Sequence, residues 1–426
     1  MSQPKTPPMK SRWKLPVITL TAAALALGGY LMGLRSATQH DRAYFAIKEM
    51  KVMAAHEIAA LEEKIHPAAT NNGELATDEI KAFTANDFSL TLLHIGAFGN
   101  TEKTAGFVNN AQGALTKFEQ SAIDRFWADT GMAQVITDAR PTQHRGGGLK
   151  QTFNYKGQQL GLVSMQKEGD PSCFFASLVN FSLKKEVFRA PCLPPVEELD
   201  FSSLGGAWTA TDEGILFSLG TPSDDERIAS LAQDQTSPYG KVLAFTAGEL
   251  QASSPAGIDH FHVHSSGHRN PQGMVTLGKQ VYSIDHGPKG GDEINLLEAG
   301  KNYGWPLYSF GSTYQGVPHK PHGDPAQFTE PLFAFIPSIA PSDITECPAS
   351  LSARYAPMNC VLITSLRGMS LFVGLIDSQH RVVSLERIAV DMRLREFFKL
   401  PNGNLAVATD GYGAFEIGIS DMPTLH

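Results

Sequence analysis

The sequence lacks the short motifs that mark the commonest catalytic sites. It has no G-x-S-x-G nucleophile elbow, no G-x-x-x-x-G-K-[ST] phosphate loop and no H-E-x-x-H zinc helix. Its four cysteines include no C-x-x-C pair, which argues against a zinc or thiol-redox site. The net charge is −8 and basic residues cluster only at the N-terminus, so we expect no nucleic-acid partner.

Charge is absent from one long stretch near the N-terminus. Residues 15–34 (LPVITLTAAALALGGYLMGL) are uncharged and long enough to span a bilayer. Four basic residues precede this stretch, namely Lys5, Lys10, Arg12 and Lys14. This pattern predicts a cytoplasmic tail at residues 1–14 and a single-pass inner-membrane anchor at residues 15–34, with the bulk of the chain in the periplasm. A cleaved signal peptide, with Ala24-Leu25-Ala26 as its cleavage site, is the alternative.

Export would place the four cysteines in an oxidising compartment, where disulfides persist. The pairs that we expect are Cys173–Cys192 and Cys347–Cys360. Four cysteines allow three pairings, and the sequence alone does not choose among them. Four buried free thiols are the alternative.

Glycine and proline are missing from residues 41–65, which are rich in helix formers with a helical spacing of apolar residues. We expect a stalk helix there and a polar linker after it, so that residues 35–87 connect the anchor to the main domain. The stalk could pack on its own domain, or it could support self-association or docking on a membrane protein.

Long helical periods are scarce after residue 87, and residues 115–129 are the main candidate. Gly and Pro are abundant, with 39 and 26 residues, and short apolar or alternating runs, such as residues 214–219 and 241–245, lie between turn clusters. Residues 88–420 are therefore predicted to form one all-β domain. Sandwich, barrel and propeller architectures all fit this pattern, because no clear internal repeat selects among them.

Two loops in the C-terminal half carry the most specific pattern. The first is GHRNPQGM at residues 267–274, and the second is DHGPKGGDEINLLEAGKNYGWP at residues 285–306. This pair resembles the signature of the quinoprotein glucose/sorbosone (aldose sugar) dehydrogenases, which use pyrroloquinoline quinone (PQQ) and calcium. The resemblance covers roughly residues 203–419, and it implies a six-bladed β-propeller with the cofactor on its top face.

The resemblance implies a set of site residues. PQQ is a flat tricarboxylate with an ortho-quinone, so its site needs cations and amides, and calcium needs oxygen ligands. The positions that match the family's cofactor and substrate contacts are Arg269, Asn270, Gln272, Arg367, Arg393 and Arg395. Arg367 stands in SLRG, where the family has a lysine. The predicted metal site comprises the backbone carbonyls of Gly287 and Pro288, with Asp292 and Tyr303 in the continuation of that motif.

The sequence departs from the family at its catalytic base. The family's base histidine precedes a Gly-Gly pair, and Ser203 occupies that position here. Ala207 stands where the family has an arginine, and Thr221 where it has an acidic residue. A serine hydroxyl without its own activating partner cannot act as a base at neutral pH. The family's catalytic position, Ser203, is therefore predicted to be non-functional.

Histidines upstream of the first motif offer a substitute. His260, His262 and His264 alternate in IDHFHVHSS, which would place them on one face of a strand. They could reach the pocket or bind a transition metal, or they could form a solvated strand face. His286, beside Gly287, is more typical of a structural residue.

Two functions remain open from the sequence. The first is an active PQQ- and calcium-dependent enzyme that oxidises an aldose to its lactone and passes electrons to a membrane acceptor. The second is a catalytically inactive propeller that binds a cofactor, a sugar or a protein. The stalk and the altered N-terminal half favour the second function. The arginines at the family's cofactor positions favour cofactor binding in both.

Overall fold

The computed structural model describes residues 80–85, 88–96, 120–251, 259–313, 325–409 and 413–421. The predicted tail, membrane anchor and stalk helix lie outside these ranges. Among the described helices, none is both long enough and apolar enough to cross a membrane.

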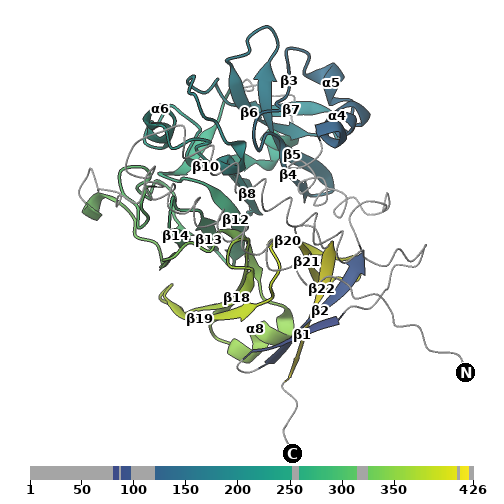
Figure 1. Ribbon diagram of the computed structural model, residues 1–426, viewed down its shortest axis with the longest axis vertical. Helices are drawn as coiled ribbons and strands as arrows, with labels where there is room; N and C mark the ends of the chain where they lie inside the picture. The colour runs from purple at the N-terminus through teal and green to yellow at the C-terminus, as the bar shows by residue number, and fades with distance from the viewer. Residues whose placement is uncertain are drawn as a thin grey trace, which may run out of the picture. The chain divides into compact units, whose positions relative to one another are not determined.

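Antiparallel strands dominate the described residues and form five separate sheets (Figure 1). The first sheet comprises β3 (Ala139–Pro141), β4 (Gly148–Tyr155), β5 (Gln158–Lys167), β6 (Phe174–Asn180) and β7 (Lys185–Arg189), with β3 and β4 both paired to β5. The second comprises β8 (Gly205–Ala210), β9 (Gly214–Leu219), β10 (Lys241–Thr246) and β11 (His262–Ser266). The third comprises β12 (Pro271–Leu277), β13 (Gln280–Asp285), β14 (Asp292–Leu297) and β15 (Phe333–Phe335).

The last two sheets complete the described architecture. The fourth comprises β16 (Pro341–Glu346), β17 (Asn359–Ser365), β18 (Ser370–Ile376) and β19 (Val382–Ala389). The fifth joins β20 (Leu394–Lys399), β21 (Leu405–Thr409) and β22 (Ala414–Asp421) to β2 (Phe88–Gly96) and β1 (Ile80–Thr84). Strands from both ends of the domain therefore share one sheet, which fastens the C-terminal part of the domain to its N-terminal part.

Helices are short and lie between strands. They are α4 (Gln120–Asp129), α5 (Met132–Val135), α6 (Glu226–Ala229), α7 (Ala247–Gln251) and α8 (Ala349–Tyr355), with 3₁₀ turns η1 (Phe201–Ser203), η2 (Ser230–Ala232) and η3 (Pro325–Gln327). The predicted helix at residues 115–129 corresponds to α4.

Successive sheets pack their apolar faces against each other. One buried cluster joins Leu178 and Phe188 of the first sheet to Phe217 of the second. Another joins Leu362 of the fourth sheet to Phe415 of the fifth. Face-to-face packing of this kind buries the alternate residues of each strand in an apolar core.

One strand from each of the five sheets lines a central cavity. Strands β4, β8, β12, β16 and β20 follow one another through neighbouring contacts, and they line a cavity of about 1210 Å³. A hydrogen bond of 2.8 Å from Gln151 on β4 to Glu396 on β20 links the first sheet to the last. This radial arrangement is that of a β-propeller, and it excludes the sandwich and the closed barrel. Five sheets lie within the described residues, so the sixth blade stays a prediction.

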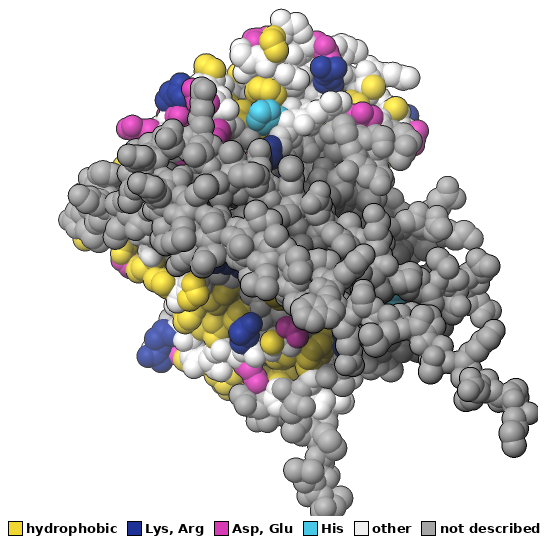
Figure 2. Space-filling model, viewed as in Figure 1, with side chains coloured by type: hydrophobic (Ala, Val, Ile, Leu, Met, Phe, Trp, Pro, Cys, Tyr) yellow, Lys and Arg dark blue, Asp and Glu magenta, His cyan; other side chains and the backbone are white. Residues whose placement is uncertain are grey.

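Both expected disulfides are confirmed. Cys173 bonds to Cys192 and Cys347 bonds to Cys360, so the alternative of free thiols is wrong. The first disulfide links the residue just before β6 to the segment after β7. The second links the residue just after β16 to β17. On the face shown in Figure 2, the acidic and basic side chains of the described residues are interspersed rather than gathered by sign.

Candidate functional site

The first signature loop is positioned by a buried carboxylate. Asp285, at the end of β13, accepts hydrogen bonds from the backbone N–H groups of Asn270 at 2.6 Å and Arg269 at 3.3 Å. Its Oδ2 lies 3.5 Å from Nδ1 of the fully buried His268. The carboxylate therefore fixes the backbone immediately before β12, where the motif residues begin.

The two signature loops pack closely against each other at Gly267. Gly267 has a φ of +77°, and a Cβ built on it would lie 2.2 Å from Oδ1 of Asn302 in the second loop. Ser266 and Asn302 form an isolated β-bridge next to this contact. Glycine is required at position 267 because of both its backbone conformation and the close approach of the second loop.

The Arg269 guanidinium is held by protein groups on several sides. Its Nε and Nη2 atoms donate to the Asp224 carboxylate at 3.0 and 3.1 Å. Its Nη1 donates to the carbonyl oxygens of Gly287 at 3.0 Å and His286 at 3.4 Å, and the group lies 5.3 Å from the centre of the Trp305 ring. Arg269 thus joins the two motifs, and its side chain is only 8% exposed.

Asp292 anchors the Gly-Pro loop. Its carboxylate accepts hydrogen bonds from Gly287 N, Ser338 Oγ, Ile339 N and Ala340 N, at distances of 2.6 to 3.0 Å. Each oxygen therefore has two donors, and Asp292 is 1% exposed. These bonds join the loop that follows β13 to the segment before β16.

These residues do not fit a calcium ion as they are arranged. Calcium would require the carbonyl oxygens of Gly287 and Pro288 as ligands. The Gly287 oxygen instead accepts a hydrogen bond from the positively charged Arg269. A second cation at that oxygen would be opposed by the guanidinium.

Tyr303 fills an interior position. Its hydroxyl donates to the carbonyl oxygen of Leu296 and accepts from the backbone N–H of Glu298 at 3.0 Å. Its ring stacks on His268 with 4.7 Å between ring centres. Burial raises the pKa of the phenol, which keeps it a neutral hydrogen-bonding group.

The predicted cofactor residues fall into separate places. Gln272 and Arg395 line the central cavity, whereas Arg269 and Gly287 line a second, much smaller one. Asn270 is buried, and its Oδ1 accepts from Gly205 N at 3.0 Å and from Gln272 Nε2 at 2.7 Å. Asn270 thus orients the amide of Gln272 at the cavity wall.

The other two predicted arginines lie outside the lining of the central cavity. Arg367 and Arg393 are both exposed, and Nη1 of Arg393 lies 3.4 Å from the carbonyl oxygen of Leu366. They place positive charge on the surface near the turn that follows β17. Of the four arginines that the sequence assigns to the cofactor site, Arg395 is therefore the one that lines the central cavity.

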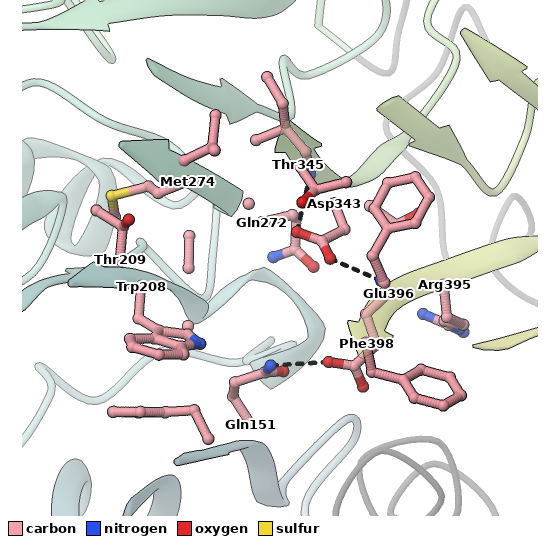
Figure 3. A pocket seen from close by; sticks show the side chains of 18 of the residues that line it. Gln151, Trp208, Thr209, Gln272, Met274, Asp343, Thr345, Arg395, Glu396 and Phe398 are labelled. Atoms are coloured by element: carbon pink, nitrogen blue, oxygen red, sulfur yellow. Dashed lines mark hydrogen bonds between the residues drawn. The ribbon is translucent and has the colours of Figure 1, made fainter. Parts of the chain in front are cut away.

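Among the ionisable groups that line the central cavity and that no sequence motif indicated, Lys150, Asp343 and Glu396 have shifted pKa values, and Figure 3 shows the two carboxylates. Burial raises the pKa of Asp343 to about 8 and that of Glu396 to about 7. Burial lowers the pKa of Lys150 to about 8; Asp200 opposes this shift and Arg395 adds to it. Each of these three groups can therefore gain or lose a proton close to neutral pH. Trp208 stacks on Phe153 at 4.4 Å between ring centres and adds an aromatic wall.

Within the part of the chain that the structure describes, the Ser203 hydroxyl has no histidine or carboxylate side chain as a hydrogen-bond partner. Ser203 ends the turn η1, and its backbone N–H donates to the carbonyl oxygen of Asp200. Thr221, at the family's acidic position, accepts a 3.0 Å hydrogen bond from Trp305 Nε1 and is 1% exposed. Ala207 is buried in β8. Nε2 of His286 donates a hydrogen bond of 2.5 Å to the carbonyl oxygen of Pro341, a structural contact.

A family model for "Glucose / Sorbosone dehydrogenase" matches residues 197–416. The chain is 30% identical over 217 residues to aldose sugar dehydrogenase YliI of Escherichia coli, covering 48% of this chain and 57% of that protein. It is 29% identical over 212 residues to an uncharacterized protein of Synechocystis, covering 47% and 51%. The chain thus spans about half the length of these curated relatives.

Solved structures show the same fold. The crystal structure of the soluble aldose sugar dehydrogenase from Escherichia coli in its apo form has a TM-score of 0.53 and 23% identity, covering 66% of this chain and 84% of that one. A crystal structure of a glucose dehydrogenase has the same TM-score and coverage at 24% identity. The family match extends over more than half of the 426 residues, so the protein belongs to the glucose/sorbosone dehydrogenase family.

Proposed function

We propose that this protein binds PQQ at the mouth of its central cavity and oxidises an aldose there to its lactone. The observation that carries the proposal is that Lys150, Gln272 and Arg395 all line the central cavity. Ser202, in the turn that bears the family's base position, lines the same cavity. The proposal includes a six-bladed propeller anchored in the inner membrane by residues 15–34 and facing the periplasm. Electrons would pass to a membrane acceptor.

The cavity residues suit a flat, polycarboxylate ligand. Arg395 offers a guanidinium that can meet a carboxylate with two hydrogen bonds, and Gln272 offers an amide for a carbonyl oxygen. The volume of about 1210 Å³ exceeds that of ordinary small-molecule sites. When bound, PQQ supplies the acceptor for the hydride of the sugar. Calcium has no place in this proposal because Arg269 engages the Gly287 oxygen.

Lys150 is the proposed base. In its neutral form, its amine can take the proton of the sugar's anomeric hydroxyl group, and a pKa of about 8 makes that form available at mildly alkaline pH. The aromatic wall formed by Trp208 would cover the apolar face of a sugar ring. The protein's contribution is then to orient the sugar and to accept one proton.

Arg395→Ala is expected to weaken PQQ binding roughly 10–100-fold, because a hydrogen bond to a charged group contributes about 1.5–3 kcal/mol. The measurement is a titration of the full-length chain with PQQ, followed by quenching of tryptophan fluorescence. Arg381→Ala is the matched control, because that guanidinium pairs with Asp377 on the surface. Equal binding by wild type and Arg395→Ala would contradict the proposed site.

A catalytically inactive propeller is the second candidate. It is favoured by Ser203 and Thr221, which replace the family's base and acidic residue, and by the Arg269–Asp224 ion pair. Such a protein would use the same cavity to bind a cofactor, a sugar or a segment of a protein, without turnover.

A further inference from the structure

Glu249, His260 and His262 meet on the outer side of the second sheet, away from the proposed cofactor cavity. Among the described residues, this is the one group of three or more His, Cys, Asp or Glu side chains whose ligand atoms all lie within 4.8 Å of one another. Glu249 belongs to α7, His262 begins β11, and His260 lies just before that strand. The group is solvent-accessible, with Glu249 30% and His262 55% exposed.

Two of the three pairs of ligand atoms have the spacing that a tetrahedral ion requires, and the third pair lies within 4.8 Å. Nε2 of His262 lies 3.2 Å from Nε2 of His260 and 3.2 Å from Oε1 of Glu249. Two ligands bound to one zinc ion at 2.0–2.1 Å and at the tetrahedral angle stand about 3.3 Å apart. The two imidazole rings are perpendicular, with 4.6 Å between centres, so they do not stack. Their Nε2 atoms instead approach each other to 3.2 Å, a distance at which both can bind one ion in place of their mutual hydrogen bond.

A hydrogen-bond arrangement orients the carboxylate. Oε2 of Glu249 accepts from the backbone N–H of Thr246 at 2.7 Å and from its hydroxyl at 2.8 Å. These bonds leave Oε1 directed at His262. Hydrogen-bonded carboxylates and imidazoles of this type set the geometry of metal sites and raise their affinity.

A β-bulge in β11 keeps the third histidine of the sequence pattern, His264, out of this group of ligands. Val242 pairs with Ser265 and Leu243 pairs with Val263, so His264 is the extra residue in β11. A bulge re-aims the side chain and breaks the alternation. His264 is accordingly half-buried, with Nε2 buried and unpaired among the described residues.

We propose that Glu249, His260 and His262 bind a divalent transition-metal ion of the zinc type. Two imidazoles and one carboxylate suit zinc, copper or nickel, whereas calcium and magnesium prefer oxygen ligands throughout. Three protein ligands leave a fourth position for water or for a group from another molecule. The site is independent of the proposed sugar oxidation, so it can be tested whether or not that activity exists.

The test is a calorimetric titration of the full-length chain, made without a polyhistidine tag, with Zn²⁺ alone. One ion per chain is expected for the wild type. Loss of a hydrogen-bonding partner of a ligand typically weakens metal binding 10–100-fold, so Thr246→Val is expected to weaken it about tenfold and His262→Ala, which removes a ligand, at least about 100-fold. Glu249→Gln is expected to act like His262→Ala.

His144→Ala is the matched control, because it removes an exposed imidazole from another part of the chain. It is expected to bind Zn²⁺ like the wild type. Circular dichroism melting curves would verify that each variant is folded; the three ligands are exposed or half-buried, so their removal should leave the core intact. Absence of Zn²⁺ binding by the wild type, or equal binding by wild type and His262→Ala, would overturn the assignment.

Discussion

Lys150→Met, loaded with PQQ, is expected to oxidise aldoses roughly 10²–10⁴-fold more slowly than the wild type, because it lacks the positioned base. PQQ binding should be retained, since the proposed carboxylate contact comes from Arg395. The comparison is made by single-turnover reduction of the bound cofactor, which separates the chemical step from release of the product.

The pH profile gives an independent signature of the same residue. Burial lowers the pKa of Lys150 to about 8, below its ordinary 10.5, so the amine becomes neutral as the pH rises through about 8. The rate of the wild type should therefore increase with pH through that region and then level off. In Lys150→Met this step should disappear.

Two further variants separate charge from proton transfer. Lys150→Arg keeps a positive charge but cannot lose its proton, so it should be as slow as Lys150→Met. Ser203→Ala should leave the rate unchanged, because the serine hydroxyl has no base beside it. A fast Lys150→Arg variant, or a slow Ser203→Ala variant, would show that Lys150 is not the base.

Asp292→Ala is expected to destabilise the folded protein by about 4 kcal/mol, because it leaves four donors on half-buried residues without their acceptor. The measurement is urea unfolding of the apo protein, made once with a calcium chelator and once with added calcium and no chelator. The loss should be the same with and without added calcium, because the carboxylate holds the Gly-Pro loop through hydrogen bonds.

Asp292→Asn is the matched control. Its carbonyl oxygen keeps part of the acceptor capacity, but its NH₂ group faces donors, so an intermediate loss is expected. If the destabilisation by Asp292→Ala appeared only when calcium was added, Asp292 would instead act as part of a metal site.

Local patterns in the sequence predicted individual strands well. The run at residues 214–219 is β9, and the run at residues 241–245 lies within β10. Both are short and apolar between turn residues, so local composition is enough to identify them. The radial arrangement of the sheets could not be predicted from periodicity, because the blades differ in sequence. It required the resemblance carried by the two signature loops.

The candidate site shows where sequence reasoning ends. The sequence identified Arg269 and Asp292 as site residues but did not identify their hydrogen-bond partners. Those partners are Asp224 and residues 338–340, which lie at distant positions that no motif links to the two site residues. Lys150 stands in a region that resembles the family poorly, and a lone lysine carries no spacing signal. Its low pKa arises from burial in a cavity formed by strands distant in sequence. His264 was misplaced because a one-residue bulge is invisible to an alternation rule.

The most direct test of the central claim is the absorption spectrum of the PQQ-loaded, full-length protein before and after addition of a panel of aldoses at pH 8.5, with the calcium chelator present. Our account predicts conversion of the bound quinone to its reduced form by at least one aldose, without calcium and without a histidine at position 203. An unchanged spectrum with PQQ shown to be bound would contradict it, and would assign the protein to the inactive, cofactor-binding alternative.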